Sequence, residues 1–348
     1  MAYTTINKSG DYFNTKLYTG NGGTQAVTGV GFQPDLCWIK DRSASQEHMW
    51  YDAVRGNDKL LRSNNTAGDA TTSTTVYFNS FDSDGFTVGS ESALNGNGAN
   101  LVGWNWLANG AGSANTTGSI NSTATSANTT AGFSIVKYTG NQTSGATVGH
   151  GLGAVPKMII VKNLNDTENW VVYHASLGNT KRLSLNLTEE ETTDSAVWNN
   201  TTPTSSVFSL GNSDKSNNVN IPYIAYCFAE KTGYSKFGKY TGNGSTDGTF
   251  IYTGFKPAFV MWKNTTSAGY YWHIMDNKRE PNNPAGLNLF PNLSNAENDY
   301  GDTCDFVSNG FKFRTGSSGL NTNGQVYIYM AFAEAPLVGT NNVPCTAR

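Results

Sequence analysis

Apolar residues in this chain alternate with polar ones or form short blocks, and the blocks are bounded by Gly, Asn and Pro. Helical periodicity is almost absent. In residues 326–334 both faces of a strand would be apolar, one of them carrying Val326, Ile328, Met330 and Phe332. The runs 158–161 and 259–262, each just after a proline, have the same character. This pattern predicts short strands that are buried on both faces.

Turn residues separate these strands. Asn309-Gly310 lies between two apolar runs, and Asp84-Gly85 lies between Phe81 and Phe86. Asn-Gly and Asp-Gly supply the positive φ angles that tight hairpins need. About seven or eight short strands at such spacing are typical of sandwiches and barrels. We therefore predict an all-β chain of antiparallel, jelly-roll-like β-sandwiches.

A tetrapeptide, Tyr-Thr-Gly-Asn, occurs three times, beginning at Tyr18, Tyr138 and Tyr240. A proline follows each copy after 16 to 18 residues, and a lysine follows each proline after six more, at positions 40, 162 and 263. Self-similarity of this kind predicts three tandem repeats of about 100 residues. The three tyrosines are predicted to be equivalent structural anchors, and a second set of equivalent core or rim rings is expected at Trp50, Trp170 and Trp272.

The repeats predict a division of the chain into an N-terminal arm (1–10), three sandwiches (11–110, 132–231 and 232–336), a linker (111–131) and a C-terminal tail (337–348). Residues 111–131 contain only Gly, Ala, Ser, Thr, Asn and one Ile. Such a segment buries too little apolar surface to offset its ordering entropy, so we expect a linker or long loop. The arm and tail are expected to be free to reach neighbouring subunits.

Composition narrows the classes of function. The formal net charge is −3, and only 14% of residues are charged. A chain without a basic field lacks the attraction that dominates nucleic-acid binding, so no nucleic-acid partner is expected. No long apolar run or signal-peptide pattern occurs, which predicts a soluble protein made in a host cytoplasm, without membrane insertion.

Residues that could carry catalysis are scattered. The histidines at 48, 150, 174 and 273 have no metal-binding spacing, and the four cysteines occur at unrelated positions in the copies. Neither a phosphate-binding loop nor a nucleophile elbow is present. We expect no metal, no cofactor and no catalytic residues, and buried reduced thiols.

Two loops of the third copy are candidate binding regions. Rings beside amides and carboxylates are typical of sugar-binding surfaces, and here they are Tyr270, Tyr271 and Trp272 with Asp276. A second loop gathers the carboxylates Glu297, Asp299, Asp302 and Asp305. Alternatives stay open for both, because rings in sandwiches usually belong to the core. The carboxylates could be a solvated turn, or could hide a pair for glycoside hydrolysis.

Three phrases carry a family resemblance: KYTGNGSTDGTFIYTGFKPAFVMWKN (239–264), DFVSNGFKFRTG (305–316) and VYIYMAFAEAP (326–336). They resemble a family of repeated, β-rich virion proteins from tailed bacteriophages of marine bacteria and cyanobacteria. The third copy matches best and the first least. The resemblance implies a structural, tail-associated or fibre-like role, and it brings no catalytic residue with it.

These observations lead to a hypothesis and two alternatives. The first is a non-enzymatic component of the virion exterior, in the tail, fibre or adsorption apparatus, that contacts other virion proteins and a host-surface glycan. A capsid decoration (cement) protein and a polysaccharide depolymerase are the alternatives. A homo-oligomer is expected; fibre proteins are often trimers, and three internal repeats could also imitate a trimer within one chain.

Overall fold

The structure is a computed structural model that describes residues 3–317, 319–339, 344 and 345, with only the backbone of Asp302. Strands pair in antiparallel ladders, which confirms the predicted all-β class. Helical segments among the described residues are short: η1 (Ser9–Asp11), α1 (Ser92–Asn95) and α2 (Ser195–Trp198).

The strands form three units, each with a large and a small sheet. In unit 1 the large sheet has the order β1 (Phe13–Thr19), β9 (Asn100–Trp106), β3 (Leu36–Asp41), β4 (Met49–Asp52), β5 (Gly56–Arg62), β6 (Ala70–Thr71). Its small sheet has the order β2 (Gln25–Thr28), β8 (Gly85–Val88), β7 (Phe78–Asp82).

Unit 2 has a large sheet whose order is β10 (Ser113–Asn115), β11 (Ser122–Asn128), β12 (Phe133–Thr139), β19 (Pro222–Ala229), β14 (Pro156–Asn163), β15 (Val171–His174), β16 (Lys181–Ser184), β17 (Thr192–Thr193). Its small sheet pairs β13 (Ala146–Gly149) with β18 (Val207–Leu210).

Unit 3 has the sheet order β20 (Ser235–Thr241), β27 (Val326–Pro336), β22 (Phe255–Asn264), β23 (Trp272–Asp276). A second sheet has the order β21 (Phe250–Tyr252), β26 (Gly310–Phe313), β25 (Asn298–Val307), β24 (Ala285–Asn288). The pairing β1-β9-β3-β4 thus has counterparts in β12-β19-β14-β15 and β20-β27-β22-β23.

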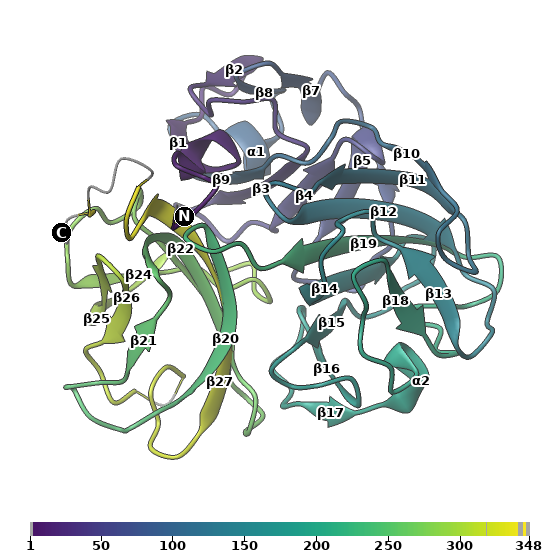
Figure 1. Cartoon of the computed structure of the whole chain (residues 1–348). Helices are drawn as coiled ribbons and strands as arrows, with labels where there is room; N and C mark the ends of the chain where they lie inside the picture. Colours follow the sequence, from purple (N-terminus) through teal and green to yellow (C-terminus); the bar gives the residue numbers. More distant parts are fainter. Residues whose placement is uncertain (1–2, 318, 340–343, 346–348) are drawn as a thin grey trace.

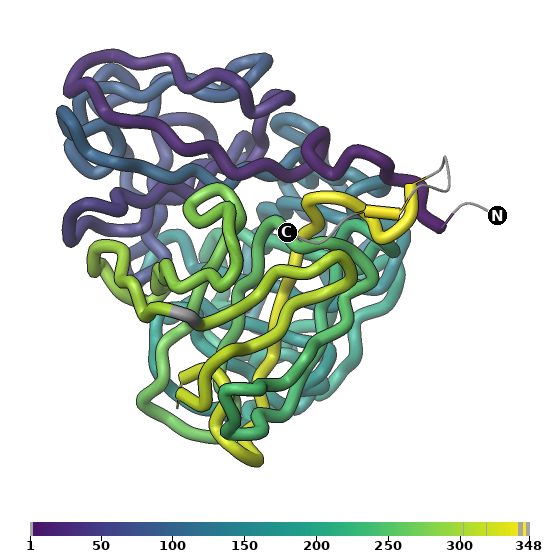
Figure 2. The backbone as a smooth tube through the Cα atoms, turned by 90° about the vertical axis from the view of Figure 1, so that its left-hand side faces the viewer, coloured from purple at the N-terminus to yellow at the C-terminus, as the bar shows by residue number. Residues whose placement is uncertain are grey.

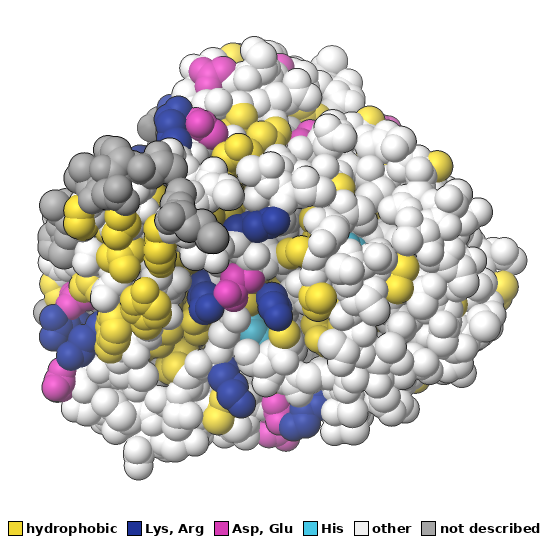
Figure 3. Space-filling view, viewed as in Figure 1, with side chains coloured by type: hydrophobic (Ala, Val, Ile, Leu, Met, Phe, Trp, Pro, Cys, Tyr) yellow, Lys and Arg dark blue, Asp and Glu magenta, His cyan; other side chains and the backbone are white. Residues whose placement is uncertain are grey.

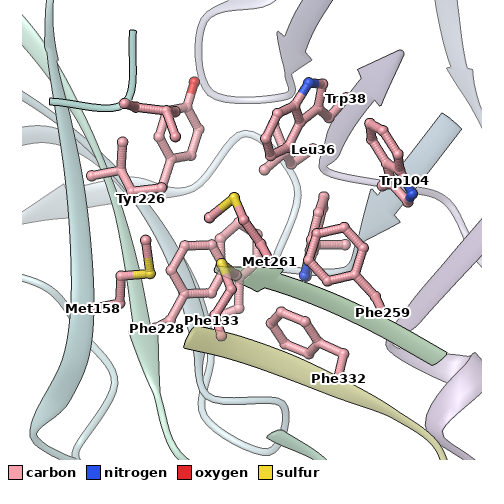
Figure 4. Packing of buried hydrophobic residues seen from close by; sticks show 14 of the residues in the cluster. Leu36, Trp38, Trp104, Phe133, Met158, Tyr226, Phe228, Phe259, Met261 and Phe332 are labelled. Carbon is pink, nitrogen blue, oxygen red and sulfur yellow. The ribbon is translucent and has the colours of Figure 1, made fainter. Parts of the chain in front are cut away.

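The units surround a common centre as three lobes (Figure 1). Their large sheets turn one face to this centre, where the facing side chains form one cluster that draws on all three units. Trp106, Phe228 and Phe332 hold the same register position in β9, β19 and β27. Their rings meet pairwise, with centroids 5.7 to 6.4 Å apart. Figure 4 shows how aromatic and methionine side chains of the three units interdigitate there.

The opposite face of each large sheet packs against the small sheet of its own unit. In β27, Ile328, Met330 and Phe332 belong to the central cluster. Tyr327, Tyr329, Ala331 and Ala333 belong to the core of unit 3. The predicted division of this strand into two apolar faces is confirmed. Each large sheet is therefore a middle layer, covered by its own unit on one side and by the other units on the other.

The Tyr-Thr-Gly-Asn tetrapeptides make the same contacts in all three units, and we call each set of contacts the clamp. The tyrosine hydroxyl donates to a backbone carbonyl, from Tyr18 to Leu94 (2.6 Å), from Tyr138 to Ser216 (2.7 Å) and from Tyr240 to Leu320 (2.7 Å). The amide after the glycine donates to a buried asparagine side chain, from Asn21 to Asn95, Asn141 to Asn217 and Asn243 to Asn321 (2.9 to 3.0 Å).

Steric crowding explains why each clamp contains a glycine. A Cβ atom added to Gly20, Gly140 or Gly242 would lie 2.1 to 2.3 Å from a carbonyl oxygen of the opposing loop. No side chain fits at that distance, so glycine is required for the close approach of the two backbones.

Two segments differ from the sequence prediction. Residues 111–131, expected to be a linker, contain β10 and β11, which extend the large sheet of unit 2 beyond β12. Apolar area was the wrong criterion, because the ladder to β12 satisfies the backbone of β11, and Ser122 and Ser126 are buried without large side chains. The Asn109 amide also donates to the Ser126 hydroxyl (2.7 Å).

The N-terminal arm, expected to be free, packs on unit 3 where it is described. The Tyr3 and Thr4 hydroxyls donate to the carbonyls of Gly254 and Thr232 (both 2.7 Å), and Ile6 joins the central cluster. Figure 2 shows this purple segment reaching from unit 1 to the third unit. In the tail, the Cys345 amide donates to the Leu337 carbonyl (3.0 Å), and residues 340–343 and 346–348 lie outside the described part.

The expected set of equivalent tryptophans needs one correction. All three rings are buried, but Trp50 pairs with Trp38, whereas the residues at that register position in units 2 and 3 are Val172 and Ile274. The counterpart of Trp170 and Trp272 is His48. The backbone amides of these three residues donate to the side chains of Asn64, Asn186 and Asn292, each at 3.0 Å. The prediction took Trp50 as the counterpart of Trp170 and Trp272, whereas the true counterpart, His48, lies two residues earlier.

Candidate functional site

Two of the predicted binding residues, Tyr270 and Tyr271, line a pocket of about 190 Å³ at the start of β23. The other lining residues are Gly269, His273, Tyr300, Ser317, Gly319 and Leu320. Tyr271 and Tyr300 are 38% and 47% exposed. The structure thus joins the predicted ring cluster to Tyr300, which comes from the strand that the predicted acidic loop forms. We call this the rim pocket.

Aromatic packing supports the rim pocket from behind. The buried Phe290 ring meets Tyr271, His273 and Tyr300 edge-on, with centroids 5.4, 5.2 and 6.0 Å away. His273 also stacks on Trp262 at 5.4 Å with nearly parallel planes. These contacts fix the orientation of the rings before any ligand arrives, which lowers the entropy cost of binding.

His273 is a neutral side chain at the base of the pocket. Burial lowers the pKa of its imidazole to about 4, although the Asn288 side chain, 3.2 Å from Nδ1, acts in the opposite direction. The ring therefore carries no charge at neutral pH and offers one donor and one acceptor nitrogen.

The wall of the pocket formed by Gly319 and Leu320 is positioned by the clamp of unit 3. The Leu320 carbonyl accepts the hydrogen bond of Tyr240, which holds residues 319–321 in place. A Cβ atom on Gly319 would lie 3.0 Å from His273 Nε2. The counterparts of Gly319 beside the other two clamps are Ala93 and Lys215. Of the three positions, only the one in unit 3 is occupied by glycine, which leaves space there for the pocket.

The remaining predicted binding residues have structural contacts. Trp272 is buried, and its Nε1 donates to the Ser184 carbonyl of unit 2 (2.9 Å). Asp276 pairs with Arg279 (2.5 Å), and Glu297 pairs with Arg42 (2.6 Å) and Arg279 (2.8 Å).

The other carboxylates of the predicted acidic loop are Asp299, Asp302 and Asp305. Asp305 is buried and pairs with Arg314. Asp299 is exposed and accepts the Gly301 amide (2.8 Å). The side chain of Asp302 lies outside the described part. Pairing to arginine accounts for Asp276, Glu297 and Asp305, none of which lines the rim pocket.

The junctions between units repeat one backbone hydrogen bond. In each, an amide donates to the carbonyl two residues after the repeated lysine: Glu297 to Arg42 (2.9 Å), Asp69 to Leu164 (2.6 Å) and Glu191 to Thr265 (2.9 Å). Unit 3 thus donates to unit 1, unit 1 to unit 2, and unit 2 to unit 3. Head-to-tail contacts of this kind close into a ring.

Side chains connect the same pairs of units in the opposite direction. Trp170 of unit 2 donates through Nε1 to the Arg62 carbonyl of unit 1 (3.0 Å), as Trp272 of unit 3 does to Ser184 of unit 2. In unit 1 the counterpart is His48, which lies beside the Phe290 carbonyl of unit 3. Burial lowers the pKa of His48 well below its usual value.

Two junctions contain a buried ion pair, and the third does not. Tyr226 of unit 2 donates to Asp52 of unit 1 (2.8 Å), which also pairs with Arg55 (2.5 Å). Trp104 of unit 1 donates to Asp276 of unit 3 (3.0 Å).

At the third junction, between units 2 and 3, the register places Met330 at the position of Tyr226 and Trp104. Methionine has no donor. There, His174 holds the position of Asp52 and Asp276, and its Nε2 lies 3.2 Å from the Tyr329 carbonyl. Leu177 stands in place of the arginine.

The three repeated lysines are buried at the junctions. Lys162 of unit 2 donates to two backbone carbonyls, that of Thr66 in unit 1 (3.0 Å) and that of Glu168 in its own unit (2.8 Å). Burial lowers the pKa of Lys40, Lys162 and Lys263 to about 8, and carboxylates near each of them act in the opposite direction. Near Lys40 these are Asp41 and Glu47 of its own unit and Glu297 of unit 3. Near Lys263 they are Glu189 and Glu190 of unit 2.

A family model described as "Domain of unknown function (DUF7483)" matches residues 8–336. The chain belongs to this family. One continuous match covers β1 to β27, so the family model spans the whole ring. No curated protein and no solved structure matches the chain.

Within the part that the structure describes, no three His, Cys, Asp or Glu side chains are placed to hold a metal ion. No helix of the described residues has the length and apolarity to cross a membrane. Cys37, Cys227 and Cys304 are buried free thiols.

Sequence reasoning missed His273, Tyr300, Gly319 and Leu320 as lining residues of the rim pocket. Two signals were available in the sequence: His273 follows Trp272 directly, and Leu320 precedes the asparagine of the clamp. The approach of Tyr300 depends on the path of β25, which no local pattern specifies.

Proposed function

We propose that this protein is a non-enzymatic structural component of the exterior of a tailed bacteriophage virion, in the tail, fibre or adsorption apparatus. Its role is to contact other virion proteins and to present loops to a host-surface glycan. The family resemblance of the three phrases motivates the virion assignment. The observation that carries the mechanical role is the closed ring of head-to-tail junctions.

The ring suits a protein that must keep its shape outside a cell. Each large sheet is buried on both faces, and the three units share one central core. Opening one junction would expose part of this core, so the units are expected to unfold together. The face seen in Figure 3 is mostly uncharged polar surface, with hydrophobic side chains gathered over unit 3 on the left.

The acidic side chains support a role without catalysis. A hydrolase of glycosidic bonds needs two carboxyl groups that reach the substrate. In the predicted acidic region, Asp276, Glu297 and Asp305 are each paired with an arginine, and Asp276 is fully buried. Such pairing orients these carboxylates toward the protein itself.

The test is the composition of purified virions. Mass spectrometry of particles from which loosely bound protein has been washed should find this chain, and antibodies against it should label the tail region in electron micrographs. Absence from washed particles would overturn the proposal. Incubation of the pure protein with host-envelope glycans should release no oligosaccharide, and release would show a depolymerase.

Capsid decoration is the second candidate, and the ring favours it specifically. Three similar units around one axis match the local threefold positions of a capsid lattice without requiring three chains. Copy number separates the two locations: a tail protein is expected in a few to a few dozen copies, and a decoration protein in hundreds. Gel densitometry against the major capsid protein distinguishes them.

The oligomeric state of the protein also bears on its location in the virion. A homo-oligomer, with a trimer as one form, stays a prediction; the ring already provides a threefold arrangement within one chain. Sedimentation velocity of the pure protein measures it. A trimer would place three rings, and three rim pockets, in one assembly.

A further inference from the structure

We infer that the rim pocket of unit 3 binds a single neutral pyranose ring at the end or edge of a glycan. This inference deepens the proposed adhesion role and rests on it for the source of the ligand. It is argued from the lining residues, their charge and the size of the pocket.

The lining fits the two kinds of surface that a sugar presents. A pyranose has a face of C–H groups and a rim of hydroxyls. The negative faces of aromatic rings attract the slightly positive C–H face, and Tyr270, Tyr271 and Tyr300 provide such rings at the mouth. Their phenol hydroxyls, the Ser317 hydroxyl and the imidazole of His273 can pair with sugar hydroxyls.

Charge selects neutral sugars. Among the side chains that the structure describes, none that lines the pocket is charged, since the low pKa of His273 keeps its imidazole neutral. The carboxylate of a sialic or uronic acid would lose water in this pocket without gaining a cationic partner. Two arginines that are close in sequence to lining residues, Arg279 and Arg314, are paired with carboxylates.

Size limits the ligand to about one ring. The pocket volume of about 190 Å³ is below the roughly 300–1,000 Å³ typical of sites for drug-sized ligands. A longer oligosaccharide would therefore place one ring in the pocket and the rest in solvent.

The site occurs once per chain. The residues at the positions of Tyr270 and Tyr271 are Gln46 and Glu47 in unit 1, and Glu168 and Asn169 in unit 2. With alanine and lysine in place of Gly319, neither unit has the rings or the space. We expect one sugar per chain.

Saturation-transfer NMR with methyl glycosides tests the inference. The probes are the methyl glycosides of glucose, galactose, mannose and N-acetylglucosamine, against N-acetylneuraminic and glucuronic acids. At least one neutral glycoside should receive saturation, and the two acids should receive none. No neutral signal, or signal from the acids alone, would overturn the inference.

Variants locate the binding. Tyr271→Ala combined with Tyr300→Ala should weaken binding of the positive glycoside at least 10-fold. Gly319→Ala narrows the pocket with a single methyl group and should also weaken it. The control is Tyr252→Ala, which removes a 54%-exposed ring of β21 outside the pocket and should leave binding unchanged.

Folding and function are kept apart in this design. Thermal unfolding of each variant is measured beside the parent protein, and binding is compared at a temperature where both are folded. Small losses of stability are expected, because the tyrosines contact Phe290 and a Cβ atom on Gly319 would lie 3.0 Å from His273 Nε2. Full binding by the Tyr271 and Tyr300 double variant would overturn the site. Presence of the chain in washed virions does not depend on any of these measurements, so the virion proposal and the sugar inference can fail separately.

Discussion

The clamps and the junctions differ in how much variation they tolerate. The clamp uses the same residue types in all three units: a tyrosine, a glycine, and an asparagine on each side. The junctions keep their backbone hydrogen bonds but change their side chains, from Asp52 with Arg55 to His174 with Leu177. The three units thus have one fixed element and one variable element.

The difference has a physical origin. At the clamp two backbones approach so closely that only glycine fits, and no other arrangement of atoms gives the same contact. At the junctions the requirement is only that buried polar atoms find partners. The side chains of a junction can differ between units if donor and acceptor change as a pair. Where Trp104 provides a donor, Asp276 accepts it; where Met330 has no donor, the neutral His174 replaces the aspartate. The following predictions test this contrast.

The largest effect is expected from breaking one buried ion pair. Asp276→Ala leaves the guanidinium of Arg279 buried without its main partner and should reduce the free energy of unfolding by about 3–5 kcal/mol. Urea denaturation of the purified protein measures this loss.

A paired replacement is the matched comparison for that variant. Asp276→His together with Arg279→Leu copies the neutral junction, and a histidine can accept from a tryptophan, as His48 does from Trp38 (2.8 Å). The double variant should lose less than half as much stability as Asp276→Ala. A loss as large as that of the single variant would show that the junction side chains are not exchangeable as a set.

The neutral junction should respond to acid. Burial lowers the pKa of His174 to about 4, against about 6.5 in an unfolded chain. The unfolded state therefore takes up the proton first, so stability is full above pH 6.5 and falls between pH 6.5 and 4. Each such histidine contributes up to about 3 kcal/mol to this loss.

Urea midpoints measured from pH 7.5 to 4 follow that effect. His273, whose pKa is also about 4, adds to the slope in the parent protein. Burial also lowers the pKa of His48 and His150. His174→Gln removes one of these four titrating rings, from the junction between units 2 and 3, and should flatten the profile by roughly a quarter. Parallel profiles for parent and variant would contradict the role of His174.

A methyl group at the clamp is expected to cost somewhat less. Gly140→Ala places a Cβ atom 2.3 Å from the Asn218 carbonyl and should destabilise the protein by about 2–3 kcal/mol, since the loop has to move. Gly20→Ala and Gly242→Ala should give the same loss within error. Gly10→Ala, with open space around it, is the control and should change little. Unequal losses of stability at the three clamps would contradict the view that the clamps are equivalent while the junctions vary.

The smallest effect is expected from one clamp hydrogen bond. Tyr138→Phe removes the hydroxyl that donates to Ser216 and should cost about 1 kcal/mol. Tyr18→Phe and Tyr240→Phe should match it, and Tyr252→Phe at an exposed position should have almost no effect. Thermal or urea unfolding of the four variants in parallel measures the differences.

The sequence predicted the parts that depend on local pattern. Alternation gave the strands and the two faces of β27, and the Asn-Gly and Asp-Gly turns lie where β25 meets β26 and β7 meets β8. For the rim pocket, Tyr270 and Tyr271 were found as exposed rings beside polar residues. Trp272, by contrast, is a junction residue, because neighbouring positions of a strand point to opposite faces.

The failures have one common cause. Residues 111–131 form β10 and β11 because β12 offers a free edge, and hydrogen bonds to an edge do not require apolar side chains. The arm packs on unit 3 because the ring brings that unit beside it. His48 was hidden as a counterpart of Trp170 because a different residue type can serve the same position. In each case the partner is far away in the sequence.

By itself, the sequence determined that the chain is all-β and that several strands are apolar on both faces, because side-chain alternation is a property of the strand alone. It also marked the Tyr-Thr-Gly-Asn segments as special. Only the tertiary structure decided what covers the second face: the other two units, around one shared core of Trp106, Phe228 and Phe332. The reason is that burial is a pairwise property, and the sequence of one surface does not say which distant surface will remove it from water.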